Sequence, residues 1–127
     1  MALLAGKLSA WAAVLALTAS PTKTDSAAAL KQRADQLARE ARALAKPAGC
    51  KQVEECEVAG FGHKACGGPR EYIAYCSRTT DVKALQGKLA ELEQAEQAWQ
   101  QEAHIMSNCG LTRRPLPRLE AGECRAR

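Results

Sequence analysis

The six cysteines constrain the fold of this 127-residue chain more than any other feature. Their number is even, and none belongs to a Cys-x-x-Cys pair of the kind that redox enzymes and zinc ribbons use, so we predict disulfides. All six are candidates: Cys50, Cys56, Cys66, Cys76, Cys109 and Cys124. Six cysteines allow fifteen complete pairings, and the sequence does not choose among them.

The scarcity of large apolar side chains explains why such a chain needs disulfides. Only 4% of the residues are aromatic, so the core must be built from leucine, alanine, valine and cystine. A small domain with so thin a core gains much of its stability from covalent cross-links. We therefore predict one disulfide-stabilised domain at residues 50–127.

The first residues have the three regions of a secretory signal peptide. Lys7 supplies an early charge, residues 8–19 are apolar, and small side chains follow, so we predict a signal peptide at 1–20 with a cut as late as residue 29. The apolar run is too short to span a bilayer, and we expect no stable membrane span after its removal. The alternative is a buried amphipathic helix. Because disulfides persist outside the cytosol, we predict a periplasmic or secreted protein.

Residues 26–46 have the spacing of an amphipathic helix. Leucine and alanine recur there at alternating intervals of three and four, which forms one apolar stripe. Asp25 or Ser26 can cap the start of this helix, and Pro47 cannot continue its hydrogen bonds. The remaining side chains of the segment are mostly basic.

A second amphipathic helix is predicted at residues 81–106. Its apolar stripe ends at Met106 and is interrupted only by Glu96, and Thr80 or Asp81 is a suitable N-cap. This helix is acidic, whereas the first is basic. We therefore predict that the two helices pack with their stripes facing and their charges at the flanks.

The chain between and after the helices has the pattern of short strands. We predict strands at 56–61, 71–76 and 123–126. Alternation in the second strand places Tyr72 and Ala74 on one face and Ile73 and Tyr75 on the other. Residues 111–120 should be extended, because their two prolines exclude helix. The predicted fold class is α+β: two amphipathic helices packed on a small antiparallel sheet of two or three strands and stabilised by disulfides.

Three motifs give the chain a family resemblance. Residues 61–69 read FGHKACGGP, residues 70–76 read REYIAYC, and Gly-Glu-Cys stands at 122–124. With these motifs, residues 50–124 resemble a group of small, cysteine-rich, exported bacterial proteins of unassigned function. The resemblance implies an exported protein and no particular activity.

The most distinctive stretch for function is Cys-Gly-Gly-Pro at residues 66–69. Two glycines permit backbone angles that other residues avoid, and a cysteine can fix the turn. A rigid loop loses little entropy on binding, so we predict a contact loop made by Lys64, Gly67, Gly68 and Arg70. The simpler alternative is a tight turn that leads into the next strand.

Catalysis is weakly supported by the sequence. His63 with Cys66, or His104 with Cys109, would need free thiolates for metal binding or nucleophilic attack, and no catalytic signature is present. We predict no cofactor, no metal and no enzymatic activity. An enzyme of unfamiliar type stays as an alternative, and would be favoured by a deep polar pocket near Tyr72, Tyr75 and His63.

Charge narrows the choice of partner. The net charge of +4 is too small to indicate nucleic acid, so the predicted partner is another protein. The C-terminal tail is nevertheless basic through Arg113, Arg114, Arg118, Arg125 and Arg127. It is either solvated or in contact with anionic envelope polymers or lipid headgroups. The leading hypothesis is a secreted or periplasmic binding or inhibitory module. The main alternative is a structural envelope protein that self-associates, or binds a partner, through its heptad helices.

Overall fold

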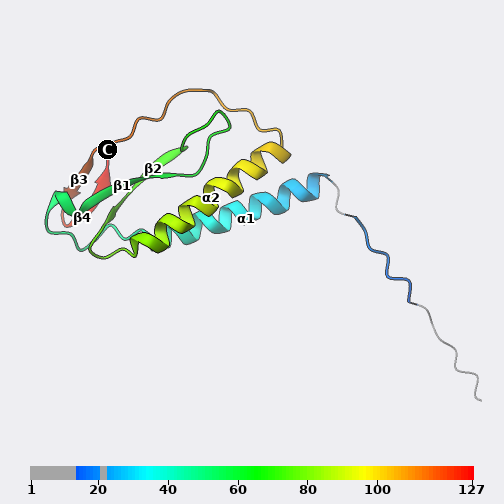
Figure 1. The fold of residues 1–127 in the computed structure, drawn as a ribbon, viewed down its shortest axis with the longest axis horizontal. Coiled ribbons are helices and arrows are strands. Elements are labelled where there is room, and N and C mark those ends of the chain that lie inside the picture. Colours follow the sequence, from blue (N-terminus) through cyan, green and yellow to red (C-terminus); the bar gives the residue numbers. More distant parts are fainter. Residues whose placement is uncertain (1–13, 21–22) are drawn as a thin grey trace, which may run out of the picture.

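The computed structural model describes residues 14–20 and 23–127 (Figure 1). The helices are α1 (Lys23–Leu44) and α2 (Val82–Glu102), and the strands are β1 (Cys56–Phe61), β2 (Glu71–Cys76), β3 (Pro117–Glu120) and β4 (Glu123–Ala126). The antiparallel β1–β2 hairpin lies above the helix pair in Figure 1, and the β3–β4 hairpin lies at its left-hand end. The predicted α+β class is therefore confirmed.

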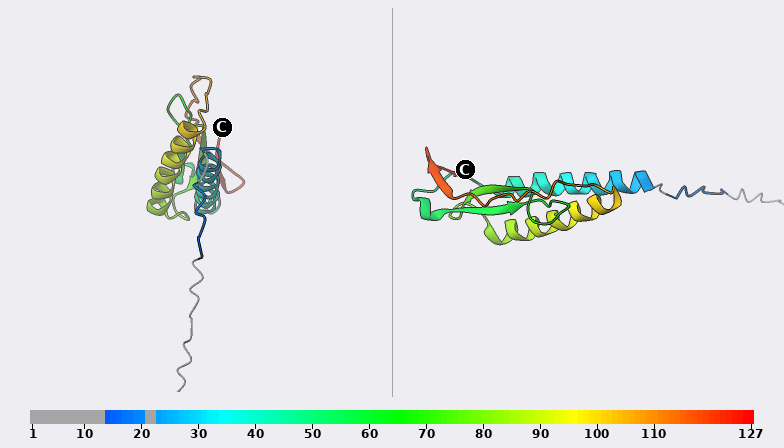
Figure 2. Two further views of the ribbon diagram at one scale, coloured as in Figure 1. Left: turned by 90° about the vertical axis from the view of Figure 1, so that its right-hand side faces the viewer. Right: turned by 90° about the horizontal axis from the view of Figure 1, so that it is seen from above.

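The two helices run antiparallel and side by side, as Figure 2 shows. Leu37 and Ala41 of α1 are buried against Leu85 and Leu92 of α2, which confirms that the apolar stripes face each other. Burying one such leucine contributes about 1.5–3 kcal/mol to folding.

An ion pair joins the two helices at their flank. Lys88 Nζ of α2 lies 3.0 Å from Glu40 Oε2 of α1, and this hydrogen bond lowers the pKa of Glu40.

The helix ends differ from the predicted ones. α1 begins at Lys23 and not at 26, so Asp25 lies in its first turn and not before it. Asp81 does cap α2, where it accepts a hydrogen bond from Ala84 N at 3.1 Å. The other end of α2 had been predicted too late.

α2 stops at Glu102 because His104 adopts a left-handed conformation, with φ of 52°. The chain then turns toward the β1–β2 loop, to which Cys109 is bonded through Cys66. Met106 therefore leaves the helical stripe and is 93% exposed.

The β1–β2 hairpin forms the middle layer of the molecule. Ile73 and Tyr75 point to the helix side, where they join Phe61 in the main core. Ala74 lies on the opposite face with Leu119 of β3, in a second cluster built on four cysteines. The predicted faces of this strand are confirmed.

The extra strand of the structure is β3. It lies within the segment that the sequence predicted to be extended, begins at Pro117 and pairs with the predicted final strand β4. Upstream of it, Arg114 Nη2 donates a hydrogen bond to Val58 O, so this part of the basic tail packs on β1 and is not simply solvated.

All six cysteines form disulfides, as predicted. The pairs are Cys50–Cys76, Cys56–Cys124 and Cys66–Cys109. The sulfurs of Cys50, Cys76 and Cys124 lie within 4.8 Å of one another, but each belongs to a disulfide and is not a thiolate ligand.

Part of the predicted signal peptide lies outside the described residues. Of residues 1–20, the structure describes 14–20, which are exposed and form neither helix nor strand. The alternative of a buried amphipathic helix is therefore wrong for these residues. In the described ranges, neither helix is apolar enough over a sufficient length to cross a bilayer.

The buried residue Tyr75 makes the free energy of unfolding depend on pH in the alkaline range. Burial, followed by the negative charge of Glu57, raises the pKa of Tyr75 above the ordinary 10.0. The resulting stability is complete below the unfolded pKa and is lost as pH rises through the folded pKa. We predict that urea unfolding between pH 9 and 11 shows this loss and that Tyr75→Phe reduces its slope. An unchanged slope would contradict this role of Tyr75.

Candidate functional site

The loop between β1 and β2, residues 62–70, contains all four predicted contact residues. Lys64 N donates to Gly68 O at 2.9 Å, and Gly67 N donates to Lys64 O at 2.8 Å, which closes a tight turn. The φ angles of Gly67 and Gly68 are 102° and 80°, in the region that favours glycine. Both glycines are exposed, and a Cβ on either would touch nothing within 4 Å. The outer part of the loop thus combines a fixed backbone with an open surface.

The segment after α2 holds the loop from one side. Cys66 is bonded to Cys109, and Lys64 Nζ donates a hydrogen bond to Gly110 O. These two links cross from the loop to a segment more than forty residues later in the chain.

The base of the loop is held by a buried carboxylate on α2. The side chain of Glu96 is only 8% exposed and accepts hydrogen bonds from Arg70 Nε at 2.9 and 3.2 Å. The same carboxylate accepts a hydrogen bond from the backbone N–H of His63. Gly62 packs so closely here that a Cβ would overlap both Arg70 and Glu96. Only glycine fits at this corner.

A second side chain of α2, that of Gln100, forms hydrogen bonds with His63 of the loop. Gln100 Nε2 donates to His63 O at 2.7 Å, and His63 Nδ1 lies 2.9 Å from Gln100 Oε1. Since the amide oxygen can only accept, Nδ1 carries the proton. His63 is therefore fixed by its backbone N–H, its carbonyl and its ring.

Arg70 contacts residues of the strands as well as the carboxylate that holds the loop. Its guanidinium lies 5.0 Å from the centre of the Phe61 ring and pairs with Glu71 at 3.4 Å, in addition to Glu96. The structure thus places Gly67 and Gly68 at the exposed part of the turn, the half-buried Lys64 at the start of that turn, and Arg70 at the base of the loop. A binding role for these four residues stays a prediction.

Sequence reasoning missed the two α2 residues that fix the loop. Glu96 was seen only as a break in the apolar stripe, and Gln100 was not singled out. The available signal was the position of Glu96: a carboxylate on the buried face of a helix needs a cationic partner. The sequence gives no means of identifying that partner as Arg70.

The residues named for the enzyme hypothesis line separate pockets. Tyr72, Tyr75 and His63 line three different pockets, whereas one deep polar pocket near all three would have favoured an enzyme. Cys66 and Cys109, the proposed thiol partners of the histidines, are bonded to each other. Both thiols are therefore unavailable as nucleophiles.

Comparison with known proteins gives no further guide to the site. No protein-family model, no curated protein and no solved structure matches this chain.

We predict that Glu96→Gln loosens the loop. The change removes the charge that Arg70 and the His63 N–H face, and it should lower the free energy of unfolding by about 1–3 kcal/mol. Hydrogen exchange of the amides at residues 62–68 should become faster. Glu93→Gln, at an exposed position of the same helix, is the matched control. Equal effects of the two substitutions would show that Glu96 does not hold the loop.

Proposed function

We propose that the protein is a secreted or periplasmic binding or inhibitory module and that the loop at residues 62–70 is its contact surface. The observation that carries this proposal is the contrast within the loop. Its base and side are fixed by Glu96, Gln100 and the Cys66–Cys109 disulfide, whereas the outer Gly67 and Gly68 are exposed.

Such a loop suits recognition of a protein. A surface that is already ordered loses little conformational entropy on binding, which leaves more of the contact energy as affinity. The narrow glycine turn can enter a concave site, such as the cleft of a hydrolase, where a larger side chain would clash. Lys64, which has three donors and uses one on Gly110 O, retains donors for a partner.

The proposed compartment rests on the disulfides and on the N-terminal segment. Three disulfides in a chain of this size fit an oxidising compartment. Val14, Leu15 and Leu17 are between 89% and 97% exposed, which fits an apolar segment that is recognised during export and not used in the core. The resemblance to small exported bacterial proteins supports the same compartment.

The alternative of an envelope protein that self-associates through its helices is less well supported. Leu37 at 2% exposure and Leu92 at 0% are already buried within one chain. The two apolar stripes proposed for assembly thus pack against each other within the chain. A charged residue in place of Leu37 would disrupt the core of the single chain, so it would not test assembly separately from folding.

We predict that Lys64→Glu weakens capture of the partner from envelope or culture-medium extracts about tenfold or more, because it reverses the charge at the centre of the loop. Lys51→Glu is the matched control, since it makes the same charge change at an exposed site outside the loop. Capture is measured by quantitative mass spectrometry on immobilised protein. A partner that is retained equally by wild type and by Lys64→Glu would rule out this loop as the contact surface.

A further inference from the structure

One edge of β2 offers unpaired backbone groups. In an antiparallel pair, alternate residues exchange hydrogen bonds with the partner strand, and the residues between them point their N–H and C=O groups outward. Ser77 N donates to Glu55 O at 2.9 Å, whereas Cys76 N turns away from β1 and donates to Lys46 O at 2.7 Å. Odd-numbered residues of β2 therefore bond to β1, and even-numbered residues face the other edge.

The partner strand shows the same alternation independently. Val58 lies opposite Ala74 in the register, and its carbonyl points out of the hairpin to accept from Arg114 Nη2. The N–H and C=O of Ala74, and by the same rule those of Tyr72, thus lie on the outer edge of β2. Within the described residues, no hydrogen bond to another element uses these groups.

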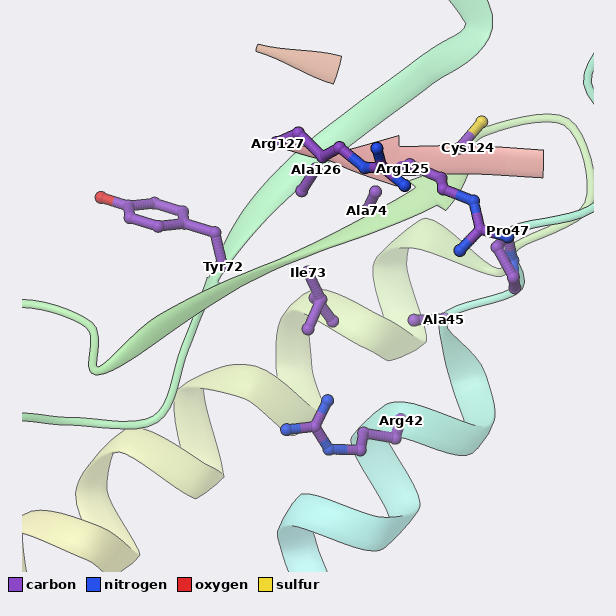
Figure 3. Close-up of a pocket in the computed structure, with 10 residues that line it drawn as sticks. All are labelled: Arg42, Ala45, Pro47, Tyr72, Ile73, Ala74, Cys124, Arg125, Ala126 and Arg127. Carbon is purple, nitrogen blue, oxygen red and sulfur yellow. The ribbon is translucent and has the colours of Figure 1, made fainter. Parts of the chain in front are cut away.

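This edge lies in a pocket of about 360 Å³, shown in Figure 3. Residues 72–74 of β2 line it together with the end of α1 and with β4, and no residue of β1 does. In Figure 3, Ile73 points toward the helices and Ala74 toward β4, so the strand edge runs between two walls. The volume is within the usual range of binding sites, about 300–1,000 Å³.

The two walls carry arginines and no acidic residue. Arg42 stands on the α1 side of β2, and Arg125 and Arg127 stand on the β4 side (Figure 3). Their side chains are 52%, 49% and 65% exposed.

Glutamates outside the pocket lining position these arginines. Glu71 pairs with Arg42, Glu123 with Arg125 at 3.0 Å, and Glu120 with Arg127 at 3.4 Å. Arg125 also lies 3.7 Å from Glu120, which it shares with Arg127. A guanidinium has five N–H donors, so each arginine keeps donors for a ligand after these pairings.

We propose that the outer edge of β2 binds an extended, acidic peptide segment by strand addition. The peptide backbone pairs with Tyr72 and Ala74, and its side chains alternate between the two walls. Two consecutive acidic residues then reach opposite walls, one at Arg42 and the next at Arg125 or Arg127. Charge complementarity selects an acidic peptide, since the charged side chains that line the pocket are all arginines. This second site does not depend on the proposed role of the 62–70 loop.

The test uses a blocked peptide, acetyl-Thr-Val-Glu-Glu-Val-Thr-amide, titrated into the ¹⁵N-labelled full chain. The amide signals of Tyr72 and Ala74 should shift, whereas those of Gly67 and Gly68 in the loop should not. Absence of saturable shifts at millimolar peptide, or shifts confined to the loop, would overturn the proposal.

Variants of the protein and of the peptide separate charge from strand pairing. Arg42→Gln combined with Arg125→Gln should weaken binding about tenfold or more, because charge-assisted hydrogen bonds are lost. Arg39→Gln combined with Arg113→Gln, at exposed positions outside the pocket, is the matched control. Equal affinities of the two double variants, each with a wild-type urea midpoint, would contradict the arginine assignment.

A backbone change in the peptide leaves the protein untouched. A series of peptides, each N-methylated at a different residue, removes one backbone donor at a time. Methylation should abolish binding at every second position, where the peptide N–H pairs with β2, and should be tolerated at the positions between. Uniform tolerance of methylation, or equally tight binding of inorganic phosphate or of vesicles containing anionic lipid, would show an anion site without strand addition and would overturn the proposal.

Discussion

Cys56 and Cys76 lie directly opposite each other where β1 begins and β2 ends, and the rest of the structure depends on the two disulfides that start from this pair. One disulfide leads back to Cys50, which follows the exit from α1, and the other leads to Cys124 in β4. Helix layer, central hairpin and second hairpin thus meet at one buried cluster. In the described residues, the main apolar core joins the helices to the central hairpin, and the cysteine cluster adds the second hairpin. The disulfides also stabilise the fold by restricting the unfolded state.

The far end of the central hairpin is held by different means. There the Cys66–Cys109 disulfide joins the loop to the segment after α2, and Glu96 and Gln100 bond the loop backbone from the helix. The hairpin is therefore fixed at both ends, with apolar packing on the helices between them. This arrangement leaves two features open to a partner, the glycine turn and the outer edge of β2. Both are held by groups that are distant in sequence.

The sequence predicted local structure well where local physics decides it. β1, β2 and β4 have their predicted bounds, since alternation and the glycines and prolines that flank strands are local signals. The end of α2 was missed because the left-handed conformation of His104 ends the helix, and the apolar spacing that continues to Met106 does not show it. The chain beyond His104 leads to Cys109, whose pairing the sequence leaves open. Three of the four predicted loop residues, Lys64, Gly67 and Gly68, form the turn. The pairing of Glu96 with Arg70 follows from tertiary contacts, and the choice of which β2 residues point their backbone groups outward follows from the strand register. Neither has a sequence signature.

The measurement that tests this account most directly is disulfide mapping of the full chain by non-reducing peptide mass spectrometry. Proteolysis without reduction should release three linked peptide pairs, Cys50–Cys76, Cys56–Cys124 and Cys66–Cys109, with no free thiol to alkylate. That result would establish the cluster that joins the layers and the link that fixes the loop. Another pairing would contradict the architecture. Six alkylated thiols in the folded protein would contradict both the architecture and the oxidising compartment on which the proposed function rests.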